Sequence, residues 1–254
     1  MKKKLVFIFL LLGLVIGVGN VFAHDAGDLM LNIEPQIGVI IPDIGIRIAG
    51  YELTDLFPNS ESSKLGLNVG LSGTVHYYFF DFIGINAGIG FTFNYIDYTL
   101  KPKNAYYSSG DPGFSFGEFY VNIPFGFRFS LSAFALGAGL SYNIPVASNA
   151  QLNNPRYNYK EQDKEFKLDS YMGWYADLGF DLSGIKGRTG GFGMMVRVSG
   201  PMSSQIGNTK NYEMFEEGVL EYKPFSHIAV SLVFQGAVEL GNFPIGGKRG
   251  GAEE

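Results

Sequence analysis

Histidine, serine and the charged residues are the side chains of this 254-residue chain that could take part in acid–base or nucleophilic chemistry. An acyl-transfer site needs a nucleophile within hydrogen-bonding reach of a base. Ser226 and His227 are adjacent, but neighbours in a strand point to opposite faces, so they cannot form a dyad by themselves. The chain has no cysteine, and therefore no cysteine nucleophile and no zinc–thiolate site. We expect no enzyme, no catalytic residue, no metal and no cofactor.

Another group of charged residues lies inside apolar segments. In residues 119–131, large apolar side chains alternate with small or polar ones, and Arg128 belongs to the small and polar set. Successive side chains of a strand point to opposite faces, so this alternation predicts a strand with one wholly apolar face. Similar segments place the rest of the group on the same kind of face. Its members are Arg128, Asp177, Asp181, Arg197 and Glu239.

Eight segments of this kind occur, most of them roughly 10 to 14 residues long, which is enough to cross a bilayer at a tilt. They cover residues 31–40, 65–79, 83–95, 119–131, 134–144, 172–182, 192–199 and 225–240. Short connections alternate with long ones, and the long ones are residues 42–64, 100–117, 146–167 and 200–224. Short turns at one end and long loops at the other are typical of membrane barrels. We therefore predict an all-β, antiparallel, up-and-down transmembrane β-barrel.

A soluble β-sandwich also alternates, but its polar face meets water and would be rich in lysine and glutamate. Here the second face consists mainly of glycine, serine and asparagine, with a few charges of both signs. That composition fits a narrow lumen in which inward charges pair with one another, so the five charged residues are expected to form a polar network there. Aromatic residues near the segment ends are expected at the membrane interfaces. They are Tyr77, Phe79, Tyr95, Tyr98, Tyr142 and Tyr171.

The N-terminus has the pattern of a cleaved signal peptide covering residues 1–23. Three lysines precede an apolar run, residues 5–18, which is shorter than the roughly 20 residues of a membrane-spanning helix. The sequence Val21-Phe22-Ala23 is suited to cleavage, and an uncleaved anchor is the alternative. The barrel is then expected over residues 24–245 and a polar tail over residues 246–254. Loss of three of the 19 basic residues leaves 16 against 24 acidic ones, which argues against nucleic acid as a partner.

These features together resemble the small eight-stranded bacterial outer-membrane β-barrels of the OmpA/OmpX type, without the peptidoglycan-binding domain. The resemblance covers about residues 29–240 and rests on the overall pattern, including the alternating last segment, residues 225–240. It implies outer-membrane lipids and the barrel assembly machinery as partners, both termini in the periplasm and four extracellular loops. Family members commonly end on an aromatic residue, whereas this chain continues past its last segment.

Three functions fit such a barrel. Eight-stranded barrels usually have interiors just filled by side chains, which favours a structural or surface-interaction, adhesin-like role through the loops. A narrow porin-like channel for small solutes is the alternative, because the inner face is rich in glycine, and a barrel enzyme acting on lipids is less favoured. Extracellular host or envelope ligands are the expected further partners. The loop aromatics expected to contact them are Tyr106, Tyr107, Tyr157, Tyr159, Tyr212 and Phe215.

Overall fold

The computed structural model describes residues 24–43, 46–48, 51–52, 60–102, 113–131, 133–154, 159–165, 169–183, 190–202, 220–222 and 226–243. The predicted signal peptide, residues 1–23, lies outside these ranges, as does the predicted tail, residues 246–254. Among the described residues, no helix is both long enough and apolar enough to cross a membrane.

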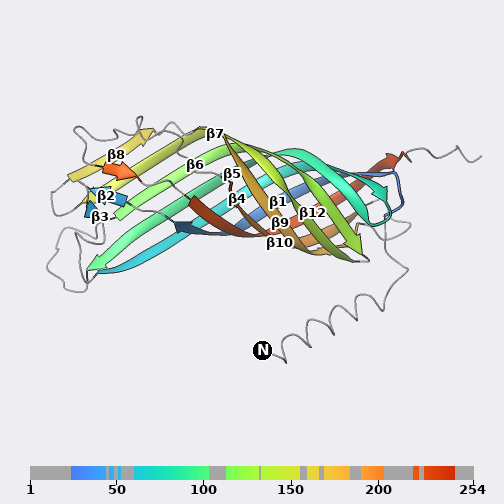
Figure 1. The fold of residues 1–254 in the computed structure, drawn as a ribbon, viewed down its shortest axis with the longest axis horizontal. Helices are drawn as coiled ribbons and strands as arrows, with labels where there is room; N and C mark the ends of the chain where they lie inside the picture. The colour runs from blue at the N-terminus through green and yellow to red at the C-terminus, as the bar shows by residue number, and fades with distance from the viewer. Residues whose placement is uncertain are drawn as a thin grey trace, which may run out of the picture.

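Eight long strands form one closed antiparallel barrel (Figure 1). Each strand pairs with its neighbours along the chain, and β1 pairs with β12 to join the two ends of the sequence. The prediction of an eight-stranded up-and-down barrel is therefore confirmed. The strands are β1 (Asp28–Asp43), β4 (Ser60–Phe80), β5 (Ile83–Pro102), β6 (Gly113–Leu131), β7 (Phe134–Asn154), β9 (Tyr171–Asp181), β10 (Gly190–Pro201) and β12 (Ser226–Asn242).

The two ends of the barrel differ in their connections. At one end, called here the short-turn end, the strands are joined by residues 81–82, 132–133 and 182–189, and β1 begins where β12 ends. At the other, called the long-loop end, β8 (Tyr159–Glu165) pairs with the outer part of β7. A small separate sheet contains β2 (Ile46–Ile48), β3 (Tyr51–Glu52) and β11 (Leu220–Tyr222).

Strand lengths differ from the prediction. Strands β4 and β7 contain 21 residues each, so the predicted loops 42–64 and 146–167 are in part strand. The alternation of large apolar residues stops where polar side chains begin, but backbone pairing continues there. The alternation of apolar residues therefore identified only the apolar part of each strand. In contrast, β9 and β10 contain only 11 and 12 residues, so the barrel wall is lowest where they lie.

The outer face is apolar and open to the surroundings. Phe127 is 66% exposed, Ile41 60% and Ile33 57%, and similar side chains occur on the same face of all eight barrel strands. A continuous apolar surface of this kind is unfavourable in water and fits contact with lipid. A closed barrel also pairs the backbone groups of every strand, which the lipid interior requires. The protein is therefore a transmembrane β-barrel.

The prediction of a position at the membrane interface was wrong for one residue. Tyr171 is 6% exposed and lies inside the barrel, on the same face of β9 as Tyr175 and Asp177. Its position at a strand end suggested an interface role, but the period of two along β9 determines which way it points.

Candidate functional site

The first feature of the lumen is an ionic cluster around Arg197 of β10. Its guanidinium donates two hydrogen bonds to Asp177 of β9, Nε to Oδ1 at 2.8 Å and Nη2 to Oδ2 at 2.9 Å. The two residues are direct cross-strand partners, which places the fork of the guanidinium against both carboxylate oxygens. Nη2 also donates to Oε2 of Glu34 on β1, at 3.1 Å. We call this group, with the Glu34 contacts below, the Arg197 cluster.

Glu34 extends the Arg197 cluster toward β4. Its Oε1 accepts a hydrogen bond of 2.9 Å from the Thr74 hydroxyl and lies 3.6 Å from Nε2 of His76. Glu34 and His76 are each 1% exposed. Each oxygen of this carboxylate therefore has a polar partner, which offsets the cost of holding it out of water.

A second ionic cluster, the Arg128 cluster, lies nearer the short-turn end. Nη2 of Arg128 donates to Oδ2 of Asp181 at 2.8 Å and to Oε1 of Gln235 at 3.0 Å. Gln235 in turn donates to Oδ1 of Asn32 at 2.9 Å, and Ser183 donates to Asp181 through its backbone and its hydroxyl. Arg128 is on β6 and Gln235 on β12, four strands apart in either direction around the barrel. This hydrogen bond therefore crosses the lumen.

Tyr175 of β9 extends across the lumen beside the Arg197 cluster. Its hydroxyl lies 3.0 Å from Nδ2 of Asn86 on β5, and the Arg197 guanidinium lies 5.0 Å from the centre of its ring. The ring tip is seated against Gly126 and Gly139, where an added Cβ would lie 2.6 Å from the tyrosine oxygen. Glycine at these two positions makes room for an aromatic side chain across the barrel.

The structure brings four of the five predicted lumen residues into these clusters. Arg128 pairs with Asp181, and Arg197 pairs with Asp177. Glu239 lies elsewhere: it is half-buried opposite Met30, and among the described residues it has no ion pair. Sequence reasoning missed the parts played by Glu34 and Gln235, although the alternation already placed both on the inner face.

The predicted loop aromatics are mostly beyond what the structure describes. Tyr106, Tyr107, Tyr157, Tyr212 and Phe215 lie outside the described residues, and Tyr159 is the first residue of β8. No group of three or more histidine and acidic side chains suited to a metal ion occurs among the described residues.

The segment before β1 folds against the short-turn end. The His24 ring stacks on Tyr78, with ring centres 3.7 Å apart. The backbone of Gly27 donates to Tyr78, and that of Ala26 donates to the Asp81 carboxylate. Burial lowers the pKa of His24 to about 4, and the nearby Asp181 and Asp28 carboxylates oppose that shift. His24 is therefore neutral at pH 7 and forms part of the packing that fills this end of the barrel.

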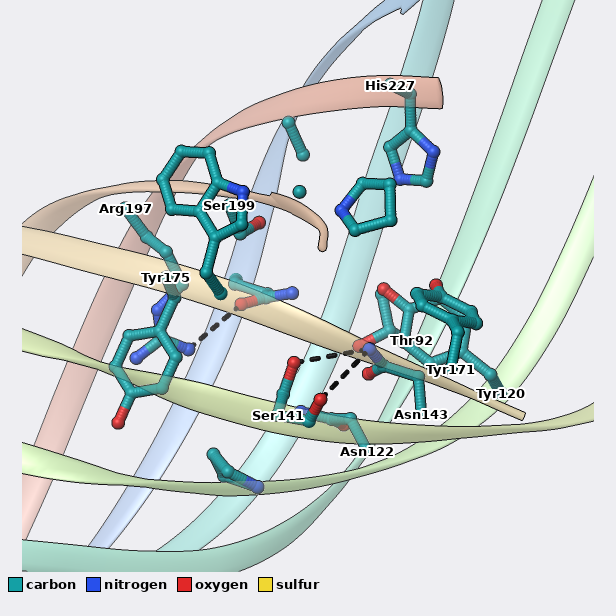
Figure 2. Close-up of a pocket in the computed structure, with 16 residues that line it drawn as sticks. Thr92, Tyr120, Asn122, Ser141, Asn143, Tyr171, Tyr175, Arg197, Ser199 and His227 are labelled. Carbon is teal, nitrogen blue, oxygen red and sulfur yellow. Dashed lines mark hydrogen bonds between the residues drawn. The ribbon is translucent and has the colours of Figure 1, made fainter. Parts of the chain in front are cut away.

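A cavity lies on the other side of the Arg197 cluster, toward the long-loop end (Figure 2). It contains about 500 Å³ of space not filled by atoms, including its open mouth. Aromatic side chains and uncharged hydrogen-bonding groups make up most of its wall, and Arg197 is the one permanently charged side chain among the described residues that line it. The wall includes Thr92, Tyr120, Tyr171, Trp174, Pro201 and His227. We call it the loop-end cavity.

The chain matches no family model and no curated protein. It is similar to the solved structure of the outer membrane protein OprG from Pseudomonas aeruginosa, at 13% identity and a TM-score of 0.43, over 86% of this chain and 99% of that one. It is also similar to Ail, the attachment invasion locus protein of Yersinia pestis, in complex with the heparin analogue sucrose octasulfate. That likeness has 10% identity and a TM-score of 0.36, over 83% of this chain and 98% of the other.

A third similar structure is the outer membrane protease OmpT from Escherichia coli, at 8% identity and a TM-score of 0.35, over 84% of this chain and 97% of that one. These likenesses are in overall shape. The assignment of this chain as a closed, eight-stranded transmembrane β-barrel comes from its own strand pairing and its apolar outer surface.

Proposed function

We propose that the protein is an integral outer-membrane barrel with a closed lumen, which acts through its long-loop end in a structural or surface-interaction, adhesin-like role. One observation carries the proposal: buried ion pairs and hydrogen bonds of the Arg128 cluster join opposite walls of the barrel, and those of the Arg197 cluster link β9, β10, β1 and β4. A solute would have to break these contacts to pass, and a broken buried ion pair is costly.

The difference between short and long connections supports surface exposure of the long-loop end. Outer-membrane barrels place short turns in the periplasm and long loops outside. We therefore infer that β1 begins and β12 ends on the periplasmic side. The absence of cysteine allows a direct test, because a single introduced thiol is the only one in the chain.

The orientation test uses S170C at the long-loop end and D81C at the short-turn end, both exposed positions. A membrane-impermeant maleimide applied to intact cells is expected to label S170C only. Both variants should react after the cells are broken open. Labelling of D81C but not S170C in intact cells would reverse the orientation and remove the surface role.

The closed lumen is tested by planar-bilayer conductance of the refolded protein. We expect no discrete openings from the native chain. The double variant R128A/D181A, which removes an ion pair as a unit, is expected to give small openings. Steady openings in the native chain would support the narrow porin-like channel instead.

The surface role is tested with cells that produce either the native chain or a variant in which residues 203–219, between β10 and β11, are replaced by a short Gly-Ser linker. Adhesion to a panel of extracellular-matrix proteins and glycans is measured for both. We expect adhesion by the native chain and its loss in the variant. Equal adhesion by cells that lack the protein would contradict the adhesin-like role and leave a structural one.

A further inference from the structure

Glu118 of β6 is a buried carboxylate that has no cationic partner among the described residues. It is 1% exposed, and its Oε2 accepts one hydrogen bond of 3.4 Å from Nδ2 of Asn94. Its Oε1 has no hydrogen-bond partner. Within the part of the chain that the structure describes, no cationic side chain forms an ion pair with it, whereas Asp177 and Asp181 each contact an arginine. An ionised carboxylate held out of water in this way is costly, so Glu118 either carries a proton or requires a positive charge beside it.

Among the described side chains of the lumen, buried carboxylates outnumber buried guanidiniums. The fully buried carboxylates are Glu34, Glu118, Asp177 and Asp181, against two guanidiniums, Arg128 and Arg197. Counted as ionised, the four carboxylates outnumber the two guanidiniums, and His76, 3.6 Å from Glu34, is a further basic group beside that carboxylate. That surplus is located at Glu118, because each of the other three carboxylates has a basic neighbour within 4.0 Å.

Glu118 lies next to the loop-end cavity. Tyr120, two residues further along the same face of β6, lines the cavity, as does its cross-strand partner Thr92. Asn94, the cross-strand partner of Glu118, also lies 3.4 Å from Nε2 of His227, a third wall residue. Figure 2 shows Tyr120, Thr92 and Tyr171 grouped on one side of the cavity. The unsatisfied carboxylate is thus one residue pair beyond the cavity wall.

We propose that Glu118 and the loop-end cavity bind a small organic cation, a primary ammonium group on a short alkyl chain. The ammonium would supply the charge and the hydrogen-bond donors that Oε1 lacks, and the alkyl part would lie among Tyr120, Tyr171 and Trp174. Aromatic faces attract cations, and they also favour the apolar stem of an amine. A hard metal ion is a poorer fit, because it needs several oxygen ligands and only one carboxylate is present.

Entry is expected over the lowest part of the barrel wall. Strand β9 begins at Tyr171 and β10 ends at Pro201, and both residues line the cavity. On the other side of the barrel, β4 and β5 extend well beyond this level. A ligand from the long-loop side can therefore reach the cavity without crossing the Arg197 cluster, so this proposal does not require an open pore.

The test uses n-propylammonium chloride and the refolded full-length chain in detergent at about pH 7.5, where a primary amine is protonated. Trp174 lines the cavity and is the only tryptophan, so its fluorescence reports binding there. We expect a saturable change and a concentration-dependent rise in the thermal unfolding midpoint. The neutral isostere n-propanol should produce neither.

Two variants locate the ligand. E118Q keeps the size of the side chain and removes its charge, and should weaken binding by at least about tenfold. E239Q, the same change at a half-buried inner-face position near the short-turn end, should bind like the native chain. Heat-modifiable gel migration verifies the fold of both. Equal affinity of E118Q and native chain, equal responses to n-propanol and n-propylammonium, or no response of the native chain in either readout would overturn the proposal.

Discussion

The two halves of the lumen differ in how their buried charges are paired. Toward the short-turn end, Arg128 and Arg197 pair with Asp181, Asp177 and Glu34. Toward the long-loop end, Glu118 is held by one amide beside a cavity. A satisfied buried network adds rigidity, whereas an unmatched charge lowers stability. Inward polar residues of similar types are therefore matched by opposite charges at one level of this barrel and not at another, among the described residues.

The strongest test of this contrast is D181N. The variant keeps the shape of the side chain but leaves Arg128 without its carboxylate, because Asp181 supplies the only ion pair of Arg128 among the described residues. Breaking a buried pair from one side typically costs about 3–5 kcal/mol. We expect a loss of that order in urea unfolding of the refolded protein, followed by Trp174 fluorescence. A loss below about 1 kcal/mol would mean that the cluster is well hydrated and does not hold the lumen closed.

A smaller loss is expected from G139A. An added methyl group would meet the Tyr175 hydroxyl at 2.6 Å and a backbone oxygen of Phe125 at 2.3 Å. Overpacking of this kind costs about 1–3 kcal/mol. The matched control is G73A in β4, where an added Cβ meets nothing within 4 Å. Unfolding in urea should separate the two variants. Equal stability of G139A and G73A would show that Tyr175 does not cross the lumen as described.

Acid should weaken the packing at the short-turn end through His24. Its folded-state pKa, about 4, lies below the ordinary value of 6.5. Between these values the unfolded chain binds more protons than the folded one, so stability falls as the pH is lowered from 6.5 toward 4. We expect a loss on the order of 1–3 kcal/mol over this window. The variant H24F keeps an aromatic ring against Tyr78 and cannot titrate. Its unfolding midpoint should fall less over the same window, and parallel curves for both proteins would contradict the assignment.

The smallest expected change in stability is that of E118Q, and it is an increase or no change. Without added amine, E118Q should be as stable as the native chain or more stable by up to about 1 kcal/mol, because it removes a buried carboxylate that pairs with no cation of the described strands. Urea unfolding of E118Q and D181N side by side checks this. Destabilisation of E118Q as large as that of D181N would mean that both halves of the lumen are held together by charge in the same way.

The sequence predicted the fold because the alternation is local. Residues 119–131 alone identify an apolar face and an inward Arg128. The same reasoning placed Arg197, Asp177 and Asp181 inside before any partner was known. The ends of the strands were harder to predict from the sequence, because beyond the apolar face a strand and a polar loop have similar compositions. Tyr171 illustrates the limit: its place near a strand end suggested an interface, but the register of β9 turns it inward.

The candidate site depended on information that the sequence does not hold in a readable form. Glu34 and Arg197 are 163 residues apart, yet they form a hydrogen bond because β1 and β10 both pair with β12. Glu118 was missed because it lies between the predicted loop, residues 100–117, and the predicted strand, residues 119–131. Nothing in the neighbouring sequence reveals that none of the described arginines pairs with it.

The sequence by itself therefore determined the class of fold, the direction of each side chain along a strand and the separation of short turns from long ones. These depend on the period of two and on local composition, which act between near neighbours. The pairing of the inward charges, the place where Tyr175 crosses and the carboxylate that pairs with no described cation became known only from the folded barrel. Those outcomes depend on strand register and on closure of the barrel, which bring distant residues within a few ångströms of one another.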